Sequence, residues 1–224
     1  MASAGAKVIL AGRRVEVLRE AAAAIGPPAG FVVCDVTRFK DAVRVVARAK
    51  ALFGPITILV NNAGVHLKKP ALETSEAEFL AVLKTHVLGS HGLTRAVLPG
   101  MLRRGHGSII YIASMASLFG IPNVFAYSAA KSAYLGMVRA LATEVSPSGV
   151  RVNAIAPGWI ETDMTRQAMT GDPARKRRIL ARTPLGRFGE PDDVGAAAVY
   201  LCSPGAKFVT GAVLPVDGGV SIGF

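Results

Sequence analysis

The sequence predicts an α/β fold: a single domain of residues 1–224 in which a doubly wound parallel sheet carries helices on both faces. Three observations predict it. Short runs rich in Val and Ile alternate with helix-like stretches from one end of the chain to the other. The runs are continuously apolar, which is typical of strands buried on both faces. No internal repeat or low-complexity linker divides the 224 residues, a length typical of one α/β domain.

Each expected strand is short, apolar and bounded by Gly, Pro, Asn or Asp. In chain order the strands are 8–10, 31–33, 58–60, 109–112, 152–155 and 213–216. Helices are expected where the pattern becomes amphipathic, over 14–24, 40–53, 75–103, 126–146, 172–181 and 192–202. Ligands of such sheets bind beyond the carboxyl ends of the strands, so functional residues should follow each strand.

Composition excludes several classes of protein. Apolar residues make up 51% and charged residues 18%, which is too apolar for a disordered chain. Cys34 and Cys202 are the two cysteines, so a disulfide scaffold is excluded and reduced cysteines of a cytoplasmic protein are expected. No run approaches 18 apolar residues, and the first residues do not resemble a secretory signal. The dispersed histidines have no metal-ligand spacing, so no metal site is predicted.

The charge balance is basic, with 26 Lys and Arg against 15 Asp and Glu, a formal net charge of +11. Such a charge admits a nucleic-acid partner. However, the basic residues are dispersed, and the densest cluster, Arg175 to Arg178, has no interleaved aromatic residues for base stacking. We therefore predict no nucleic-acid partner. The cluster is interpreted as a solvated helix face, with an anionic substrate as the alternative.

Tyr127 and Lys131 form the central candidate pair, in Tyr-Ser-Ala-Ala-Lys. Positions four apart share one helix face. An ammonium beside a phenol favours the phenolate, which predicts a lowered pKa for Tyr127 and an acid/base role. The alternative is a surface tyrosine beside a solvated lysine.

Ser114 follows an expected strand, and its hydroxyl could hold a substrate oxygen. The alternative role for Ser114 is a helix N-cap. Ser117 competes with Ser114 for the role of holding the substrate oxygen.

Taken together, these motifs resemble the short-chain dehydrogenases/reductases in order and spacing along essentially the whole chain. The matching motifs are Asn61-Asn62-Ala63-Gly64, Ser114, Tyr127-x-x-x-Lys131, Arg151-Val152-Asn153, Pro157-Gly158 and Asp217-Gly218-Gly219. The resemblance implies a Rossmann-like fold and an NAD(P)-dependent oxidoreductase that interconverts a secondary alcohol and a ketone. Gluconate 5-dehydrogenases and 3-oxoacyl-carrier-protein reductases are the most similar groups. Sugar acids and 3-oxoacyl compounds are therefore the expected small-molecule substrates, and a homotetramer or homodimer is the expected assembly.

The resemblance also implies a role for each matching residue. Tyr127 would exchange the proton with the carbinol oxygen, Ser114 would orient the carbonyl, and Lys131 would lower the pKa of Tyr127 and bind the nicotinamide ribose. The remaining cofactor-binding positions are Asp35 and Val36 at the adenine, Asn62, Ala63 and Gly64 at the adenosine ribose, and Pro157, Gly158, Ile160 and Thr162 around the nicotinamide.

The choice between NADP(H) and NAD(H) rests on the end of strand 8–10. NAD-preferring enzymes usually carry Asp or Glu there, to bind the ribose 2′-hydroxyl. Here Gly12 is followed by Arg13 and Arg14. Guanidinium groups bind phosphate bidentately, so NADP(H) is favoured. An ordinary solvated helix start is the alternative for both arginines.

Two departures from the family pattern stand out. First, the TGxxxGxG loop and its preceding strand are missing from the sequence, which predicts an N-terminally truncated sheet whose neighbouring strands have unpaired edges. Second, His86 stands where many family members carry an Asn of the proton relay. It is either a proton carrier or a structural histidine. A substrate lid is expected over 163–190.

Two further hypotheses compete with an active oxidoreductase. One is a catalytically impaired binding or scaffold protein, or a gene fragment, because the phosphate loop is missing. The other is nucleic-acid binding, which rests on charge alone.

Overall fold

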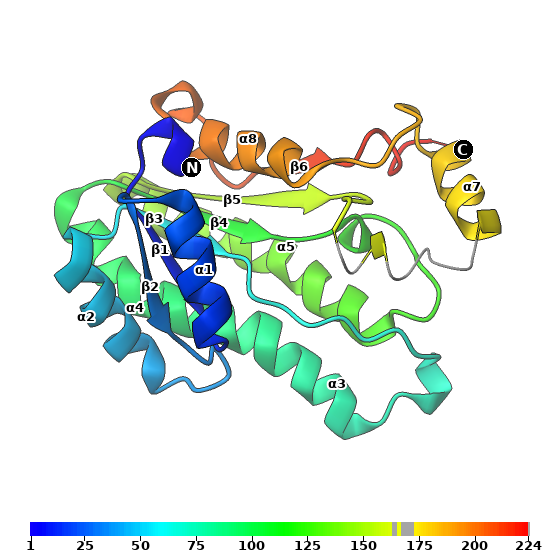
Figure 1. The fold of residues 1–224 in the computed structure, drawn as a ribbon, viewed down its shortest axis with the longest axis horizontal. Helices are drawn as coiled ribbons and strands as arrows, with labels where there is room; N and C mark the ends of the chain where they lie inside the picture. Colours follow the sequence, from blue (N-terminus) through cyan, green and yellow to red (C-terminus); the bar gives the residue numbers. More distant parts are fainter. Residues whose placement is uncertain (163–164, 167–172, 224) are drawn as a thin grey trace.

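Strands and helices alternate along the chain in the computed structural model, which describes residues 1–162, 165–166 and 173–223 (Figure 1). The strands are β1 Val8–Gly12, β2 Ala29–Val33, β3 Ile58–Asn61, β4 Gly107–Ile112, β5 Val150–Pro157 and β6 Val213–Val216. The helices are α1 Val15–Ile25, α2 Asp41–Phe53, α3 Glu76–Leu83, α4 Gly89–Arg104, α5 Phe125–Val145, α7 Pro173–Arg182 and α8 Pro191–Cys202. All six predicted strands and all the predicted helices are found, with bounds shifted by a few residues.

The described strands are all parallel, and they form two sheets. β1 pairs with β2, and a separate sheet has the order β3-β4-β5-β6. Among the described strands, β1 and β3 share no ladder, so each has one edge without a strand partner. The unpaired edges of β1 and β3 agree with the unpaired edges expected where a strand of the sheet is missing.

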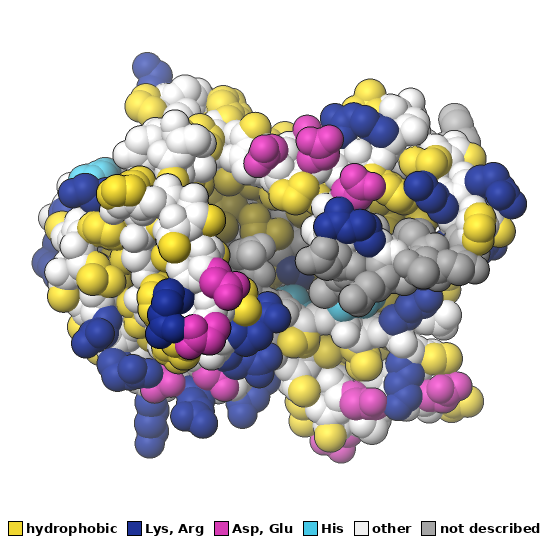
Figure 2. Space-filling view, viewed as in Figure 1, with side chains coloured by type: hydrophobic (Ala, Val, Ile, Leu, Met, Phe, Trp, Pro, Cys, Tyr) yellow, Lys and Arg dark blue, Asp and Glu magenta, His cyan; other side chains and the backbone are white. Residues whose placement is uncertain are grey.

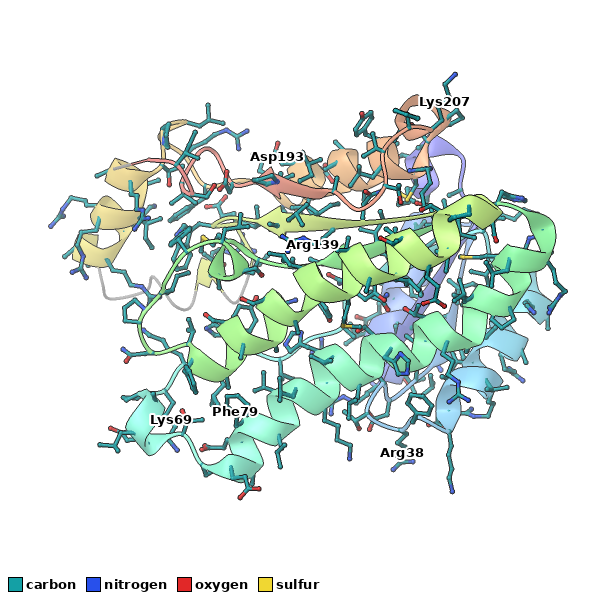
Figure 3. The ribbon with its side chains drawn as sticks, turned by 180° about the vertical axis from the view of Figure 1, so that it is seen from behind. Arg38, Lys69, Phe79, Arg139, Asp193 and Lys207 are labelled. Carbon is teal, nitrogen blue, oxygen red and sulfur yellow. The ribbon has the colours of Figure 1, made fainter. Side chains whose placement is uncertain are left out.

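Helices cover both faces of the four-stranded sheet. On one face, α4 and α5 pack against side chains such as Ile109 and Tyr111 of β4, with Tyr134 from α5. On the other face, α8 packs against Ile110 of β4 and Ile155 of β5. Alternate β4 residues thus point into two cores, as the pleat of a strand requires. The view from behind shows α4 and α5 crossing one face of the sheet (Figure 3).

The helix expected over 75–103 is interrupted near its middle. Ser75 caps α3 by accepting from the Glu78 N–H, while the Glu78 carboxylate accepts from the Ser75 N–H. A π-helical turn, Lys84–Leu88, then separates α3 from α4 and contains His86. Such turns are frequent at functional sites, and this one leaves the His86 carbonyl to accept a hydrogen bond from the Tyr134 hydroxyl at 3.0 Å.

None of the helices in the described part of the chain is long and apolar enough to cross a membrane. Cys34 is buried and Cys202 is half-buried, and both are free thiols. Burial raises the pKa of each thiol, which keeps them protonated and supports their interpretation as core residues.

Candidate active site

The carboxyl ends of the strands lie side by side within each sheet. Gly12 is paired with Val33, Asn61 with Tyr111, and Pro157 with Val216. The loops that carry the predicted site residues follow these positions. The topology therefore gathers the predicted residues at one edge of the sheets, as expected for a parallel α/β fold.

Tyr127 and Lys131 lie on the first turns of α5, on the face turned toward the core. Lys131 is buried, and its Nζ donates to the Ile112 carbonyl at 2.6 Å, at the end of β4. The same Nζ lies 5.6 Å from the centre of the Tyr127 ring and 5.1 Å from that of Tyr134. Burial lowers the pKa of Lys131 to about 8, so the amine is still mainly cationic at neutral pH.

The expected lowering of the Tyr127 pKa is not found. Burial raises it above its ordinary value, and a hydrogen bond with the Ser114 side chain offsets part of the rise. The ammonium group of Lys131 donates to the Ile112 carbonyl. The phenol is therefore protonated at neutral pH in this structure, which suits a proton donor.

Ser114 is buried immediately after β4, where its hydroxyl caps a turn and lies near enough to Tyr127 to influence the pKa of the phenol. Its Oγ accepts from the Ala116 N–H at 3.1 Å and so caps the short 3₁₀ turn Met115–Ser117. The N-cap interpretation is thus correct, and it coexists with the influence on the pKa of Tyr127. The competing Ser117 has a buried Oγ without a hydrogen-bond partner. Ser114, rather than Ser117, is the residue that the structure joins to the tyrosine.

His86 lies against this pair. It is 1% exposed, its Nε2 is 2.8 Å from the Val65 carbonyl O, and its Nδ1 is buried without a partner. Burial, followed by the Lys131 charge, lowers the pKa of His86 to about 4, so the ring is neutral at pH 7. Its ring meets the Tyr127 ring edge-on, with centroids 5.6 Å apart. His66, which the sequence gave no reason to select, also meets Tyr127 edge-on, at 4.8 Å.

The loop after β3 holds Asn62, Ala63 and Gly64, all exposed. Gly64 has a structural reason to lack a side chain, because an added Cβ would lie 2.4 Å from Cε1 of His86. The family resemblance placed Gly64 at the adenosine ribose of the cofactor. In this structure the neighbour that excludes a side chain at Gly64 is the histidine.

The adenine end of the predicted site lies after β1 and β2. Arg13 is exposed, and its charge is one of the lesser causes that lower the pKa of Asp35. The main cause is hydrogen bonding, since one Asp35 oxygen accepts from both the N–H and the Oγ1 of Thr37, at 3.0 and 2.7 Å. Val36 lies beside Asp35 and packs close to Gly89 of α4.

The nicotinamide end of the predicted site lies after β5. A Cβ on Gly158 would lie 2.6 Å from the Asp217 Cα, so glycine is required where β5 passes the end of β6. Ile160 is bridged to Gly189. Thr162 Oγ1 accepts from the Thr165 N–H at 3.2 Å.

The lid predicted over 163–190 is described in part only. Residues 163–164 and 167–172 lie outside the described residues, while α7 occupies Pro173–Arg182. Arg175, Arg178 and Arg182, spaced three and four apart on α7, line a cavity together with Trp159. Helical spacing could have marked Arg182 as part of this face, whereas Trp159 carries no such signal in the sequence. Within the same described residues, no group of three or more His, Cys, Asp or Glu side chains could hold a metal ion.

Known proteins resemble this chain along nearly its whole length. The family model described as Enoyl-(Acyl carrier protein) reductase matches residues 1–221. The "Inactive 2-(S)-hydroxypropyl-CoM dehydrogenase 2" of Xanthobacter autotrophicus is 42% identical over 222 residues, 97% of this chain and 96% of that protein.

Two solved structures show the same architecture. A putative short-chain alcohol dehydrogenase from Sinorhizobium meliloti is 37% identical with a TM-score of 0.95, over 100% of this chain and 89% of its own. A gluconate 5-dehydrogenase from Burkholderia cenocepacia, in complex with NADP and tartrate, is 31% identical with a TM-score of 0.92, over 100% of this chain and 88% of its own. The chain therefore belongs to the short-chain dehydrogenase/reductase family, NAD(P)-dependent oxidoreductases that act on CH–OH groups.

Proposed function

We propose that the protein interconverts a secondary alcohol and a ketone with NADP(H), acting on a sugar acid of the gluconate kind or a 3-oxoacyl compound. The observation that carries the proposal is the buried Lys131, whose Nζ lies 5.6 Å from the centre of the Tyr127 ring, with Ser114 near enough to influence the pKa of the phenol. The gluconate 5-dehydrogenase that binds NADP and tartrate supports both the cofactor and an acidic substrate. The homotetramer or homodimer stays a prediction.

Each member of the trio has a separate task. Tyr127, protonated because burial raises its pKa, donates its proton to the ketone oxygen during reduction. Ser114 Oγ donates to the same oxygen and holds it near the phenol. The cationic Lys131 stabilises the phenolate that is left. When bound, the nicotinamide supplies or accepts the hydride.

The described residues fit the two ends of NADP better than its centre. Arg13, exposed after β1, offers a guanidinium for the 2′-phosphate, and Lys131 offers a donor at the nicotinamide ribose. No Gly-x-x-x-Gly-x-Gly occurs in the sequence, so these 224 residues provide no such turn of backbone amides for the pyrophosphate. The assignment of NADP(H) therefore rests on the residues at the two ends of the cofactor, Arg13 at the 2′-phosphate and Lys131 at the nicotinamide ribose.

A second candidate is a binding or scaffold protein of the same fold with impaired catalysis. The Xanthobacter protein, which is named as inactive, matches this chain over 96% of its own length. The sequence also holds no Gly-x-x-x-Gly-x-Gly turn for the pyrophosphate, which favours this candidate as well.

The test is Tyr127→Phe, with Tyr200→Phe as control because Tyr200 is 47% exposed on α8. NADPH oxidation is followed with 5-ketogluconate and with a 3-oxoacyl thioester, and NADPH binding is followed separately. We expect Tyr127→Phe to lose about 10²–10⁴-fold in rate, while its NADPH binding stays unchanged. Equal rates for both variants would refute the assigned mechanism. A wild-type chain that binds NADPH but turns over no ketone would favour the second candidate.

A further inference from the structure

A cavity of about 360 Å³ opens beside α7, outside the Ser114–Tyr127 pair. One wall is a face of α7, carrying Arg175, Arg178 and Arg182 around the buried Ile179. The opposite walls include Phe119 and Trp159. Its size is at the lower end of the range for small-molecule sites. Figure 2 shows basic side chains on the end of the molecule that carries α7.

The described residues that line this cavity carry positive charge. Three of them offer a guanidinium group, and none of these described residues is an aspartate or a glutamate. The described part of the chain also shows no ion pair of Arg178 or Arg182 with a carboxylate. Like charges on one helix face repel each other, and a bound anion removes that repulsion. The cavity is therefore electrostatically suited to an anion.

Aromatic side chains hold two of the three guanidinium groups in place. That of Arg182 lies 4.4 Å from the centre of the Phe119 ring, and its Nε donates to the Val220 carbonyl at 3.4 Å. That of Arg175 lies 5.7 Å from the centre of the Trp159 ring. Such stacking restricts the long side chain of Arg182 without neutralising its charge.

Two walls of the cavity come from the segments that also carry candidate active-site residues. Phe119 to Pro122 lie between Ser114 and Tyr127 in the chain, in the segment that follows β4. Trp159 lies between Gly158 and Ile160, in the segment that follows β5. A molecule seated in the cavity therefore contacts the two segments that carry the predicted catalytic and nicotinamide-binding residues.

We propose that this cavity binds the anionic end of the substrate, a carboxylate, sulfonate or phosphate, with Arg178 as its principal donor. The inference rests on the proposed function, since it assigns the substrate class of that site. It excludes neutral polyols as good ligands. Bidentate guanidinium contacts suit all three anions, and the open mouth of the cavity admits the rest of the molecule.

Trp159 supplies the readout, because it is the single tryptophan of the chain and lines the cavity. Its fluorescence is titrated at constant ionic strength with sodium gluconate, sodium ethanesulfonate and inorganic phosphate. Glucitol, a neutral polyol of the same carbon number as gluconate, is the control ligand. We expect a saturable change with at least one of the anions and none with glucitol. Equal responses to gluconate and glucitol, or no saturable response to any of the three anions, would overturn the proposal.

Two neighbouring arginines provide the matched variants. Arg178 lines the cavity, while Arg177, also exposed on α7, does not. We expect Arg178→Gln to weaken anion binding at least about tenfold, the loss typical of one charge-assisted hydrogen bond, and Arg177→Gln to change it less than about twofold. Equal losses would show a diffuse charge effect and reject the assigned donor.

The readout needs neither cofactor nor turnover, which separates this inference from the proposed function. If the chain binds anions but Tyr127→Phe does not change the rate, the assigned mechanism is rejected and the proposed anion site stands. If ketone turnover depends on Tyr127 but no anion binds, the proposed anion site is rejected and the mechanism stands.

Discussion

Gly64→Ala tests the packing of the candidate site against His86. The added Cβ would lie 2.4 Å from Cε1 of His86 and 3.1 Å from its Nδ1, well inside ordinary contact distance. The ring cannot easily withdraw, because it is 1% exposed, is held at the Val65 carbonyl, and packs edge-on against Tyr127. Overpacking of this kind costs about 1–3 kcal/mol. For a chain of this size that lowers Tm by about 2–12 °C.

The assay is urea unfolding of four chains: wild type, G64A, H86N and the double variant. His86→Asn removes Cε1, so the cost of Gly64→Ala should fall by about 1 kcal/mol or more, within the usual coupling of residues in contact. Gly120→Ala is the control, because a Cβ there meets nothing within 4 Å and its φ is not in the left-handed region. It should be neutral or stabilising by about 0.4–1 kcal/mol. Equal effects of G64A and G120A would refute the reasoning.

Three other predictions follow from the described geometry. The pKa of His86 is about 4 in the folded chain and 6.5 ordinarily, so the unfolded chain takes up the proton first as pH falls. The free energy of unfolding should therefore drop by about 3 kcal/mol between pH 6.5 and pH 4. Urea unfolding of H86N should show a smaller drop over the same pH range. Arg13→Asp should shift the kcat/KM preference of an active form from NADPH toward NADH, and an unchanged ratio would remove the support for NADP. Residues 1–224 alone should bind NADPH weakly in a fluorescence titration. A chain extended at its N-terminus by the strand, glycine-rich loop and helix of a relative, about 25–30 residues, should bind NADPH more tightly. Equal micromolar binding by both chains would contradict this prediction.

Much of the fold could be predicted because its signals are local. Apolar runs bounded by Gly, Pro, Asn or Asp marked the six strands, and their parallel order placed Ser114 and Pro157 at the carboxyl ends. The pairing of Tyr127 with Lys131 followed from helical spacing alone. Ser75 and Glu78 likewise form the cap that begins α3, and this cap depends on residues three apart.

What could not be predicted depends on contacts between distant segments. Burial is the largest influence on the pKa of Tyr127, and residue spacing does not predict burial. Lys131 donates to the carbonyl of Ile112, which lies nineteen residues earlier in the chain. The closeness of Gly64 to His86 and of His66 to Tyr127 comes from the packing of the β3 loop on the π-helical turn and α5.

The division of the sheet has a consequence for cooperativity. The segment from β1 to α2 is joined to the rest through side chains, such as Phe39 against His91 and Val36 against Gly89, rather than through a ladder between β1 and β3. Side-chain packing alone couples two units more weakly than packing combined with a shared hydrogen-bonded sheet, so local opening of residues 8–53 should require less free energy than global unfolding. In native-state hydrogen exchange, the amides of β1 and β2 should therefore exchange as a separate group, ahead of those of β4 and β5. The same 224 residues would then behave as two folding units that share one domain.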